Sequence, residues 1–288
     1  MSDRRNAIRS ALSDLPSAGQ LYTDFYDRGR VASWVNEYPG LAAWTRKVVG
    51  RALVGWGGVA DWSGDTFGDY LYDDKACLVD ESSRNRNHLS VMEGIVRLRS
   101  ILNIPRQCVR LVGLSGLGKT RLVQALFEDD LGEGALDSAI ALYTDYSSQE
   151  TFPSARDLAR QLISQGQRII LVVDNCNPAT HSELARLCTA ETSKLSLLTV
   201  EYDVQDDEPE RTDVFRLQAS NSDLVSKWIK RNFPKISQID RERISEFSDG
   251  NFRVARAISE ALKEGETIGR LKSRELFERI FQQRNQPN

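Results

Sequence analysis

The chain has 288 residues, of which 40% are hydrophobic and 27% charged, as expected for a globular protein with enough apolar mass to form a core. Its formal net charge of −3 argues against a protein held to nucleic acid or to an anionic membrane by an overall basic field. No apolar signal-peptide segment follows Met1–Arg5, and the longest apolar runs, such as Ile169–Val173, are too short to span a bilayer. Four cysteines without paired spacing indicate reduced thiols, so we expect a cytoplasmic protein.

Residues 1–82 form a tryptophan-rich region that differs from the rest of the chain. Most of the tryptophans lie there, at positions Trp34, Trp44, Trp56 and Trp62. Apolar residues recur at helical spacing from Leu41 to Ala52, and the turn-rich and acidic sequence that follows predicts irregular or short-stranded structure. Tryptophans are common both at interfaces and in the cores of small domains. We expect a core here, and the sequence assigns this region no catalytic role.

Residues 83–218 alternate apolar runs with helical patterns. Five runs predict buried strands, over residues 109–113, 139–143, 169–174, 195–200 and 214–217, and helical patterns between them cover residues 120–128 and 154–165. Continuous apolar runs belong to strands that are buried on both faces. The sequence therefore predicts an α/β domain with a parallel five-stranded sheet and flanking helices.

Residues 219–288 predict a small all-helical domain. Four amphipathic patterns follow one another there, carried by Leu224, Trp228, Ile229, Ile239, Ile244, Phe247, Val254, Ile258, Leu262, Leu271, Leu276 and Ile280. We expect this domain to pack against the sheet domain as a lid. The predicted organisation is thus an N-terminal region over 1–82, a sheet domain over 83–218 and a helical lid domain over 219–288.

A phosphate-binding loop lies between the first predicted strand and the helix after it. The sequence Gly113-Leu114-Ser115-Gly116-Leu117-Gly118-Lys119-Thr120 matches the P-loop pattern Gly-x-x-x-x-Gly-Lys-Thr, and Arg121 follows it. Glycines let successive backbone amides converge on one point, and the helix adds its positive end, so the loop attracts a phosphate chain. Lys119 would neutralise the β- and γ-phosphates, and the hydroxyl of Thr120 would bind Mg²⁺. We therefore predict that residues 113–121 bind ATP.

The run Ile169–Asp174 is a second element of this site, because it predicts a buried strand that ends in a carboxylate. Open α/β sheets bind ligands at the C-terminal ends of their strands, so we expect Asp174 to share the Mg²⁺ with Thr120. The next residue, Asn175, cannot accept a proton from an attacking water. The sequence thus predicts either slow hydrolysis or another acid. Glu201 is one candidate, although a surface position at a strand end is the simpler expectation for it.

This order of elements resembles the STAND branch of the AAA+-related signalling ATPases, which includes the NB-ARC and NACHT proteins. The resemblance covers residues 85–285 and rests on the P-loop, the Asp174 strand, the strand Leu197–Val200 and the helical domain. Residues 109–127 in particular resemble large bacterial STAND ATPases, some of which are implicated in phage defence. Those proteins carry a long C-terminal sensor region, so this sequence resembles a shortened or minimal version of them.

The resemblance implies two residues that sense the γ-phosphate. STAND proteins commonly carry a polar sensor on the fourth strand, where Thr199 stands here, although they often have an arginine shortly after it and this chain does not. The segment Gly250–Arg253 is similar both to their Gly-x-Pro-like motif and to the Gly-x-x-Arg sensor of origin-recognition AAA+ ATPases. Proline is absent, so we expect Arg253 to contact phosphate through its forked, permanently charged guanidinium. The alternative is an arginine at a helix start that pairs with a surface acid.

Lys119, Asp174, Thr199 and Arg253 are therefore the predicted catalytic residues of a slow ATPase that uses ATP and Mg²⁺. The favoured function is a signalling switch in which ATP closes the helical domain and promotes self-association, with a protein trigger or effector that the sequence does not identify. One alternative is an origin- or clamp-type AAA+ ATPase acting on DNA, which the acidic net charge disfavours. Another is a nucleotide-dependent interaction module with little hydrolysis. No membrane partner is expected.

Overall fold

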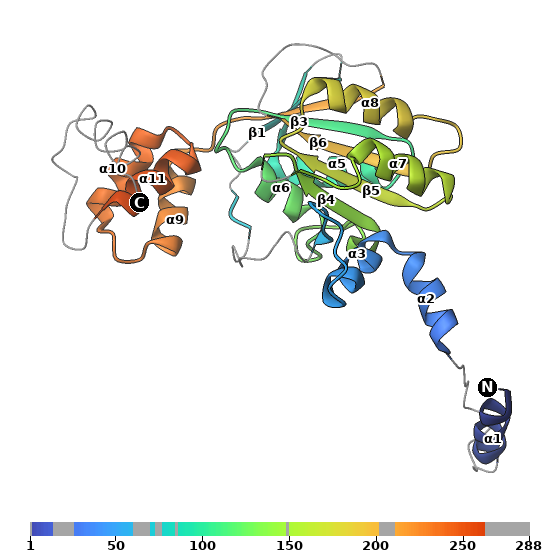
Figure 1. Ribbon diagram of the computed structural model, residues 1–288. Coiled ribbons are helices and arrows are strands. Elements are labelled where there is room, and N and C mark those ends of the chain that lie inside the picture. Colours follow the sequence, from blue (N-terminus) through green and yellow to red (C-terminus); the bar gives the residue numbers. More distant parts are fainter. Residues whose placement is uncertain are drawn as a thin grey trace.

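The apolar runs of the sequence form the strands of one sheet in a computed structural model of the chain (Figure 1), which describes residues 2–13, 26–59, 70–72, 77–83, 86–147, 150–201 and 211–262. The strands are β1 (Cys77–Asp80), β2 (Asn87–Ser90), β3 (Cys108–Val112), β4 (Ala141–Asp145), β5 (Ile169–Asp174), β6 (Leu195–Val200) and β7 (Asp213–Leu217). Their order across the sheet is β2-β1-β7-β3-β6-β5-β4.

The predicted parallel sheet is confirmed for the five strands from β7 to β4. Neighbours among them pair in parallel, and β5 and β6 have the bounds that the sequence predicted. Two further strands, which were not predicted from the sequence, extend the sheet. β1 pairs antiparallel with β7, and β2 pairs antiparallel with β1. Strand β1 comes from the region before residue 82, so this part of the chain contributes to the sheet itself.

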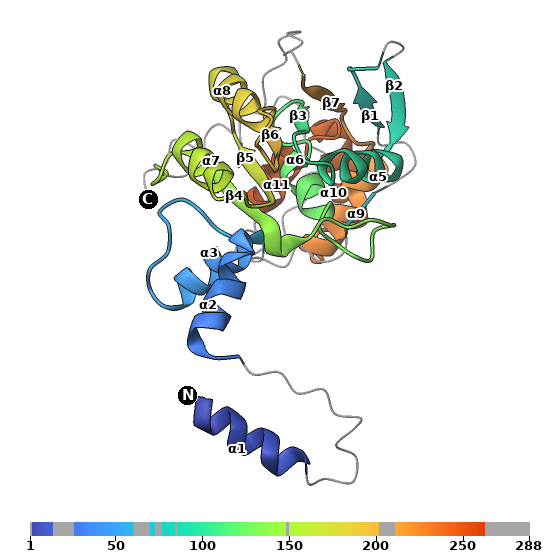
Figure 2. The same ribbon diagram turned by 90° about the vertical axis from the view of Figure 1, so that its right-hand side faces the viewer.

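Helices cover both faces of the sheet (Figure 2). Helices α5 (Val91–Leu102) and α6 (Lys119–Ala125) pack on one face, and α7 (Ala155–Ser164) and α8 (Pro178–Cys188) pack on the other. Successive residues of β5 alternate between the two cores: Ile170 and Val172 belong to the first, and Ile169 and Leu171 to the second. A strand buried on both faces needs apolar residues at every position, which explains the unbroken apolar run in the sequence.

The N-terminal region contains the helices α1 (Ser2–Ser13), α2 (Arg28–Asn36) and α3 (Pro39–Val48), of which α3 lies beside the outer edge of β4. The contact with the edge is close: a Cβ on Gly40 would lie 2.6 Å from the carbonyl oxygens of Ser138 and Ala141. Gly57 and Tyr143 exchange backbone hydrogen bonds of 3.0 and 2.9 Å across the same edge. This segment therefore covers an edge strand that would otherwise expose unpaired backbone groups.

The tryptophans of this region do not form the core that we expected. Trp56 is buried, but its indole nitrogen donates to the carbonyl oxygen of Pro153 at 2.8 Å, in the sheet domain. Trp34 and Trp44 each remain about half exposed, at 49% and 48%. Trp62 lies outside the described residues. The expectation was wrong for the described tryptophans because the sheet domain, and not a separate core, provides the burial.

The helical domain contains α9 (Ser222–Asn232), α10 (Gln238–Ser248) and α11 (Phe252–Ala261), and lies to one side of the sheet domain (Figure 1). Its own core consists of Val225, Ile229, Ile244, Ala255 and Ile258. Each helix starts at a side-chain cap, supplied by Asn221, Ser237 and Asn251 respectively. The fourth predicted helical pattern, around Leu271, Leu276 and Ile280, lies outside the described residues. In the part of the chain that the structure describes, every helix is too short or too polar to be a membrane span.

Candidate nucleotide-binding site

The loop 113–120 joins the end of β3 to the start of α6. Gly113, Gly116 and Gly118 have φ angles of 146°, 90° and 94°, which only glycine adopts without strain. Gly113 also approaches the end of β7, where an added Cβ would lie 2.7 Å from the carbonyl oxygen of Leu217. The loop thus has the curled backbone that turns successive amide groups toward a phosphate.

Lys119 is buried beneath this loop with 8% of its surface exposed. Its Nζ donates to the carbonyl oxygens of Gly113 at 2.7 Å and Leu114 at 2.9 Å. The pKa of Lys119 is lowered to about 8, mainly by burial; the charge of Asp174 opposes this shift and the charge of Arg253 adds to it. A buried ammonium held by carbonyl oxygens favours a bound anion, and a phosphate chain supplies the required charge.

Thr120 and Asp174, the two predicted Mg²⁺ ligands, are brought into direct contact. The hydroxyl of Thr120 donates to Oδ2 of Asp174 at 2.7 Å, and the backbone amide of Asn175 donates to Oδ1 at 2.8 Å. Burial raises the pKa of Asp174, and these two hydrogen bonds counteract that rise. A hydroxyl and a carboxylate beside a phosphate loop are the hard oxygen donors that Mg²⁺ prefers, so the residues present fit this ion, which would neutralise phosphate charge.

Replacing Asp174 with alanine is expected to remove the dependence of ATP affinity on Mg²⁺ while the fold stays intact. The reason is that Asp174 is the carboxylate in contact with Thr120 at the loop. Calorimetric titrations of ATP in Mg²⁺ and in EDTA test this. Asp137→Ala, which removes an exposed carboxylate from the 3₁₀ turn before β4, is the control and keeps the parent's dependence. A mutant that distinguishes the two buffers as the parent does would show that Asp174 does not bind the ion.

The side chain of Arg121 contacts residues outside both the loop and its own helix. Its guanidinium pairs with Glu128, one turn beyond the end of α6, and lies over the ring of Tyr70 at 5.0 Å from the ring centre. The ring of Tyr70 is partly buried, and desolvation of its phenol raises the pKa. Within the described residues, the contribution of Arg121 to a nucleotide site would therefore come from its backbone.

Thr199 and Glu201 belong to a buried polar network on the α8 face of the sheet. The Thr199 hydroxyl lies 2.8 Å from Nδ1 of His181 and donates to Oε1 of Glu201 at 3.3 Å. The other oxygen of Glu201, Oε2, accepts from Nε of Arg110 at 2.7 Å. Glu201 is only 1% exposed, so the expectation of a surface carboxylate was wrong. A signal for this pair is visible in the sequence, because Arg110 interrupts an otherwise apolar strand.

The helical domain contacts the P-loop through the residues at the start of α11. The Asn251 side chain donates to the carbonyl oxygen of Ser115 at 2.8 Å. The backbone amide of Phe252 donates to the carbonyl oxygen of Gly116 at 2.9 Å. A Cβ on Gly116 would lie 2.1 Å from Oδ1 of Asn251, so only glycine permits this contact. Arg253 follows, exposed and near enough to Lys119 to affect its pKa. The structure thus brings Lys119, Thr120, Asp174 and Arg253 to one site.

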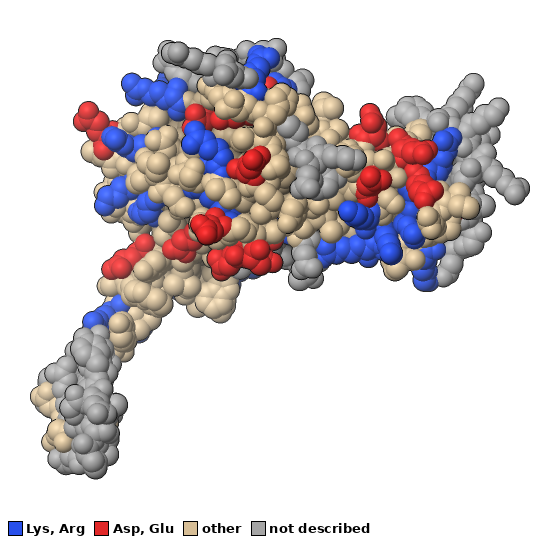
Figure 3. Space-filling view, turned by 180° about the vertical axis from the view of Figure 1, so that it is seen from behind, with Lys and Arg blue, Asp and Glu red and all other residues tan. Residues whose placement is uncertain are grey.

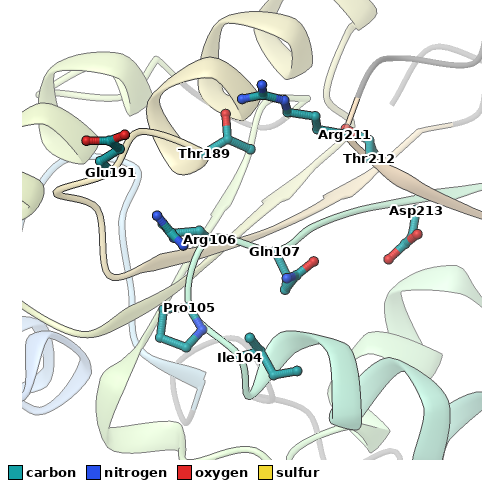
Figure 4. A pocket seen from close by; sticks show the side chains of 9 residues that line it. All are labelled: Ile104, Pro105, Arg106, Gln107, Thr189, Glu191, Arg211, Thr212 and Asp213. Carbon is teal, nitrogen blue, oxygen red and sulfur yellow. The ribbon is translucent and has the colours of Figure 1, made fainter.

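A separate pocket of about 620 Å³ lies at the other end of the sheet (Figure 4). It opens beside the N-terminal ends of β3 and β7, whereas the P-loop follows the C-terminal end of β3. Its lining residues are Ile104, Pro105, Arg106, Gln107, Thr189, Glu191, Arg211, Thr212 and Asp213. The lining contains two arginines and two acidic residues, so their charges balance. This pocket therefore shows no preference for a polyphosphate.

Known proteins resemble this chain only at the level of solved structures, since no family model and no curated protein matches the sequence. One such structure is the RuvB Holliday junction branch migration motor of Thermotoga maritima, with 16% identity and a TM-score of 0.43 over 66% of this chain and 68% of that chain. Another is a STAND protein with a tetratricopeptide repeat sensor from Pyrococcus horikoshii, with 13% identity and a TM-score of 0.42 over 72% of this chain. A third is C. elegans PCH-2, with 14% identity, a TM-score of 0.41 and coverage of 67% of each chain. The chain spans 33% of the length of the STAND protein.

Proposed function

We propose that this protein is an AAA+-type ATPase of the STAND kind, in which bound nucleotide controls how the helical domain closes onto the sheet domain. ATP is the nucleotide, held by the loop 113–120, and Mg²⁺ is its metal, held by Thr120 and Asp174. Self-association in the ATP state and a protein effector are part of the same proposal. The observation that carries it is the contact of Asn251 and Phe252 with the P-loop, because it joins the lid to the residues that hold phosphate.

The geometry of this contact favours coupling between phosphate binding and lid position. Asn251 and Phe252 both donate to carbonyl groups of the P-loop, at Ser115 and Gly116. Gly250 packs closely against the segment that connects the two domains, since a Cβ there would be 2.1 Å from the carbonyl oxygen of Ser220. A change of loop shape on ATP binding would therefore act directly on the start of α11. A ligand shifts such an equilibrium by the difference of its affinities for the two states.

The distribution of charge supports a nucleotide switch over a DNA motor. The whole chain has a formal net charge of −3. On the face shown in Figure 3, the sheet domain carries both signs of charge with acidic residues gathered along its lower edge, and the helical domain carries acidic residues on its upper side and basic residues on its lower side. Binding to a nucleic acid backbone draws most of its affinity from clustered basic residues. We therefore propose that the ligand of the site is free ATP, and that DNA does not stimulate hydrolysis.

Arg253→Ala is expected to weaken ATP binding more than ADP binding and to reduce any compaction that ATP causes. Among the described residues, the Arg253 guanidinium forms no hydrogen bond or ion pair, and its charge is close to Lys119. Only ATP carries the γ-phosphate that would attract it. We expect a difference between the two nucleotides of about 1–3 kcal/mol, from calorimetric dissociation constants of the parent and the mutant.

Arg256→Ala is the matched control for this measurement. Arg256 lies on the same helix and pairs with Glu260 at 2.7 Å, with 63% of its side chain exposed. Its removal takes away the same charge without touching the site, so both nucleotides should bind as in the parent. If Arg253→Ala weakens the binding of ATP and of ADP equally, the lid does not sense the γ-phosphate and the proposed switch is wrong. Small-angle scattering with each nucleotide measures the compaction independently.

A further inference from the structure

The residue after Asp174 is the position from which a carboxylate would activate water in an ATPase of this kind, and here it is an asparagine. Asn175 has a left-handed backbone, with φ of 51°. Its amide nitrogen Nδ2 donates to Oδ1 of Asp145 at 2.7 Å. An amide accepts no proton, so Asn175 can orient a neighbouring acid but cannot replace it.

Asp145 lies at the end of β4, directly beside the ATP site. In the parallel pairing of β4 with β5, Asp145 is the register partner of Asp174. Three donors converge on its Oδ1: Nδ2 of Asn175 at 2.7 Å, and the backbone amide and hydroxyl of Ser147, each at 2.8 Å. The side chain is only partly buried, so that water reaches it. These bonds fix the orientation of the carboxylate, as is needed for a group that acts on a single water.

The other candidate acid, Glu201, is held in a buried ion pair. Glu201 is 1% exposed, and its carboxylate pairs with Arg110 at 2.7 Å on the α8 face. A carboxylate held by a buried guanidinium is a weak proton acceptor, because proton transfer would leave the arginine without its counter-charge. Asp145 is therefore the better placed of the two acids.

We propose that Asp145 is the catalytic carboxylate of ATP hydrolysis, in place of the residue at position 175. This inference rests on the proposed function. As the water oxygen forms a bond to the γ-phosphorus, a water proton moves to the Asp145 carboxylate. The bond from the γ-phosphorus to the β,γ-bridging oxygen breaks, and its electron pair stays on ADP. Asp145 then releases the proton to solvent, so the products are ADP, phosphate and one proton. Asn175 is a positioning residue that orients Asp145.

The test compares Asp145→Asn with the parent in three measurements. Asparagine keeps the side-chain shape and the Oδ1 acceptor but cannot take a proton. The dissociation constant of Mg²⁺–ATP should stay within about threefold, whereas single-turnover hydrolysis should fall roughly 10²- to 10⁴-fold from an already slow parent rate, well below ~10 s⁻¹. The third readout is binding of ADP with aluminium fluoride, which mimics the transferring phosphoryl group with its attacking water. The gain in affinity over ADP alone should be lost. Asp157→Asn, at an exposed helix cap, is the control and should change none of the three.

A rescue variant separates a catalytic role from a structural one. Asn175→Asp in the Asp145→Asn background restores a carboxylate beside the same water, so hydrolysis should recover by about tenfold or more. Hydrolysis by Asp145→Asn at the parent rate would overturn the proposal, as would a loss of ATP affinity as large as the loss of rate. A parent that binds ATP but hydrolyses none of it would overturn the role of Asp145 alone. A parent that binds no ATP would overturn the proposed function as well.

Discussion

Arg110→Met is expected to lower the free energy of unfolding by about 3–5 kcal/mol, the largest stability effect we predict for a single side chain. Nε and Nη2 of Arg110 both lie 2.7 Å from Oε2 of Glu201, and each side chain is 1% exposed. Methionine fills a similar volume but leaves the Glu201 carboxylate buried without its cation. The cost arises from that uncompensated charge more than from the lost attraction. Urea denaturation of the parent and the mutant measures it.

Two further variants test whether burial is the cause. Arg110→Met combined with Glu201→Leu removes both charges and should recover most of the lost stability, because no charge then remains unpaired. Arg216→Met breaks a partly exposed pair with Glu81, at 2.6 Å and with side chains 22% and 18% exposed, and should cost only about 1 kcal/mol. Equal losses for Arg110→Met and Arg216→Met would contradict the explanation.

Lys119→Ala is expected to weaken ATP binding about ten- to a hundredfold, enough to abolish binding at micromolar protein concentrations. A charge-assisted contact with phosphate contributes about 1.5–3 kcal/mol, which corresponds to this change in affinity. Lys119 is the buried cation of the P-loop, held by the carbonyl groups of Gly113 and Leu114. Isothermal titration calorimetry with Mg²⁺–ATP measures the effect, and unchanged binding would remove the basis for the site.

Two controls distinguish loss of charge from loss of structure. Lys119→Met keeps the apolar stem in its buried position and should lose ATP affinity to the same extent as alanine. Lys194→Ala removes an exposed lysine just before β6, at the far end of the strands from the loop, and should bind ATP like the parent. Thermal unfolding of each variant shows whether the fold is retained.

The sequence by itself determined the features that local patterns encode. The apolar runs at 169–174 and 195–200 gave strand bounds that the structure reproduces, since a strand buried on both faces requires an apolar residue at every step. The P-loop was evident from the spacing of its glycines and the position of Lys119, because phosphate binding depends on a short continuous segment of backbone. The helical domain followed from the amphipathic repeats.

The tertiary structure alone decided which distant residues meet. Strands β1 and β2 join the sheet through the pairing of β1 with β7, in which Asp80 lies opposite Phe215. A strand of four residues carries too little sequence pattern to predict such a pairing. Glu201 was expected at the surface, but its partner Arg110 is 91 residues away. Asn251 meets Ser115 across 136 residues, and Asp145 meets Asn175 across 30. Local propensity is fixed by neighbouring residues, whereas these contacts depend on how sheet order and domain packing fold the chain back on itself.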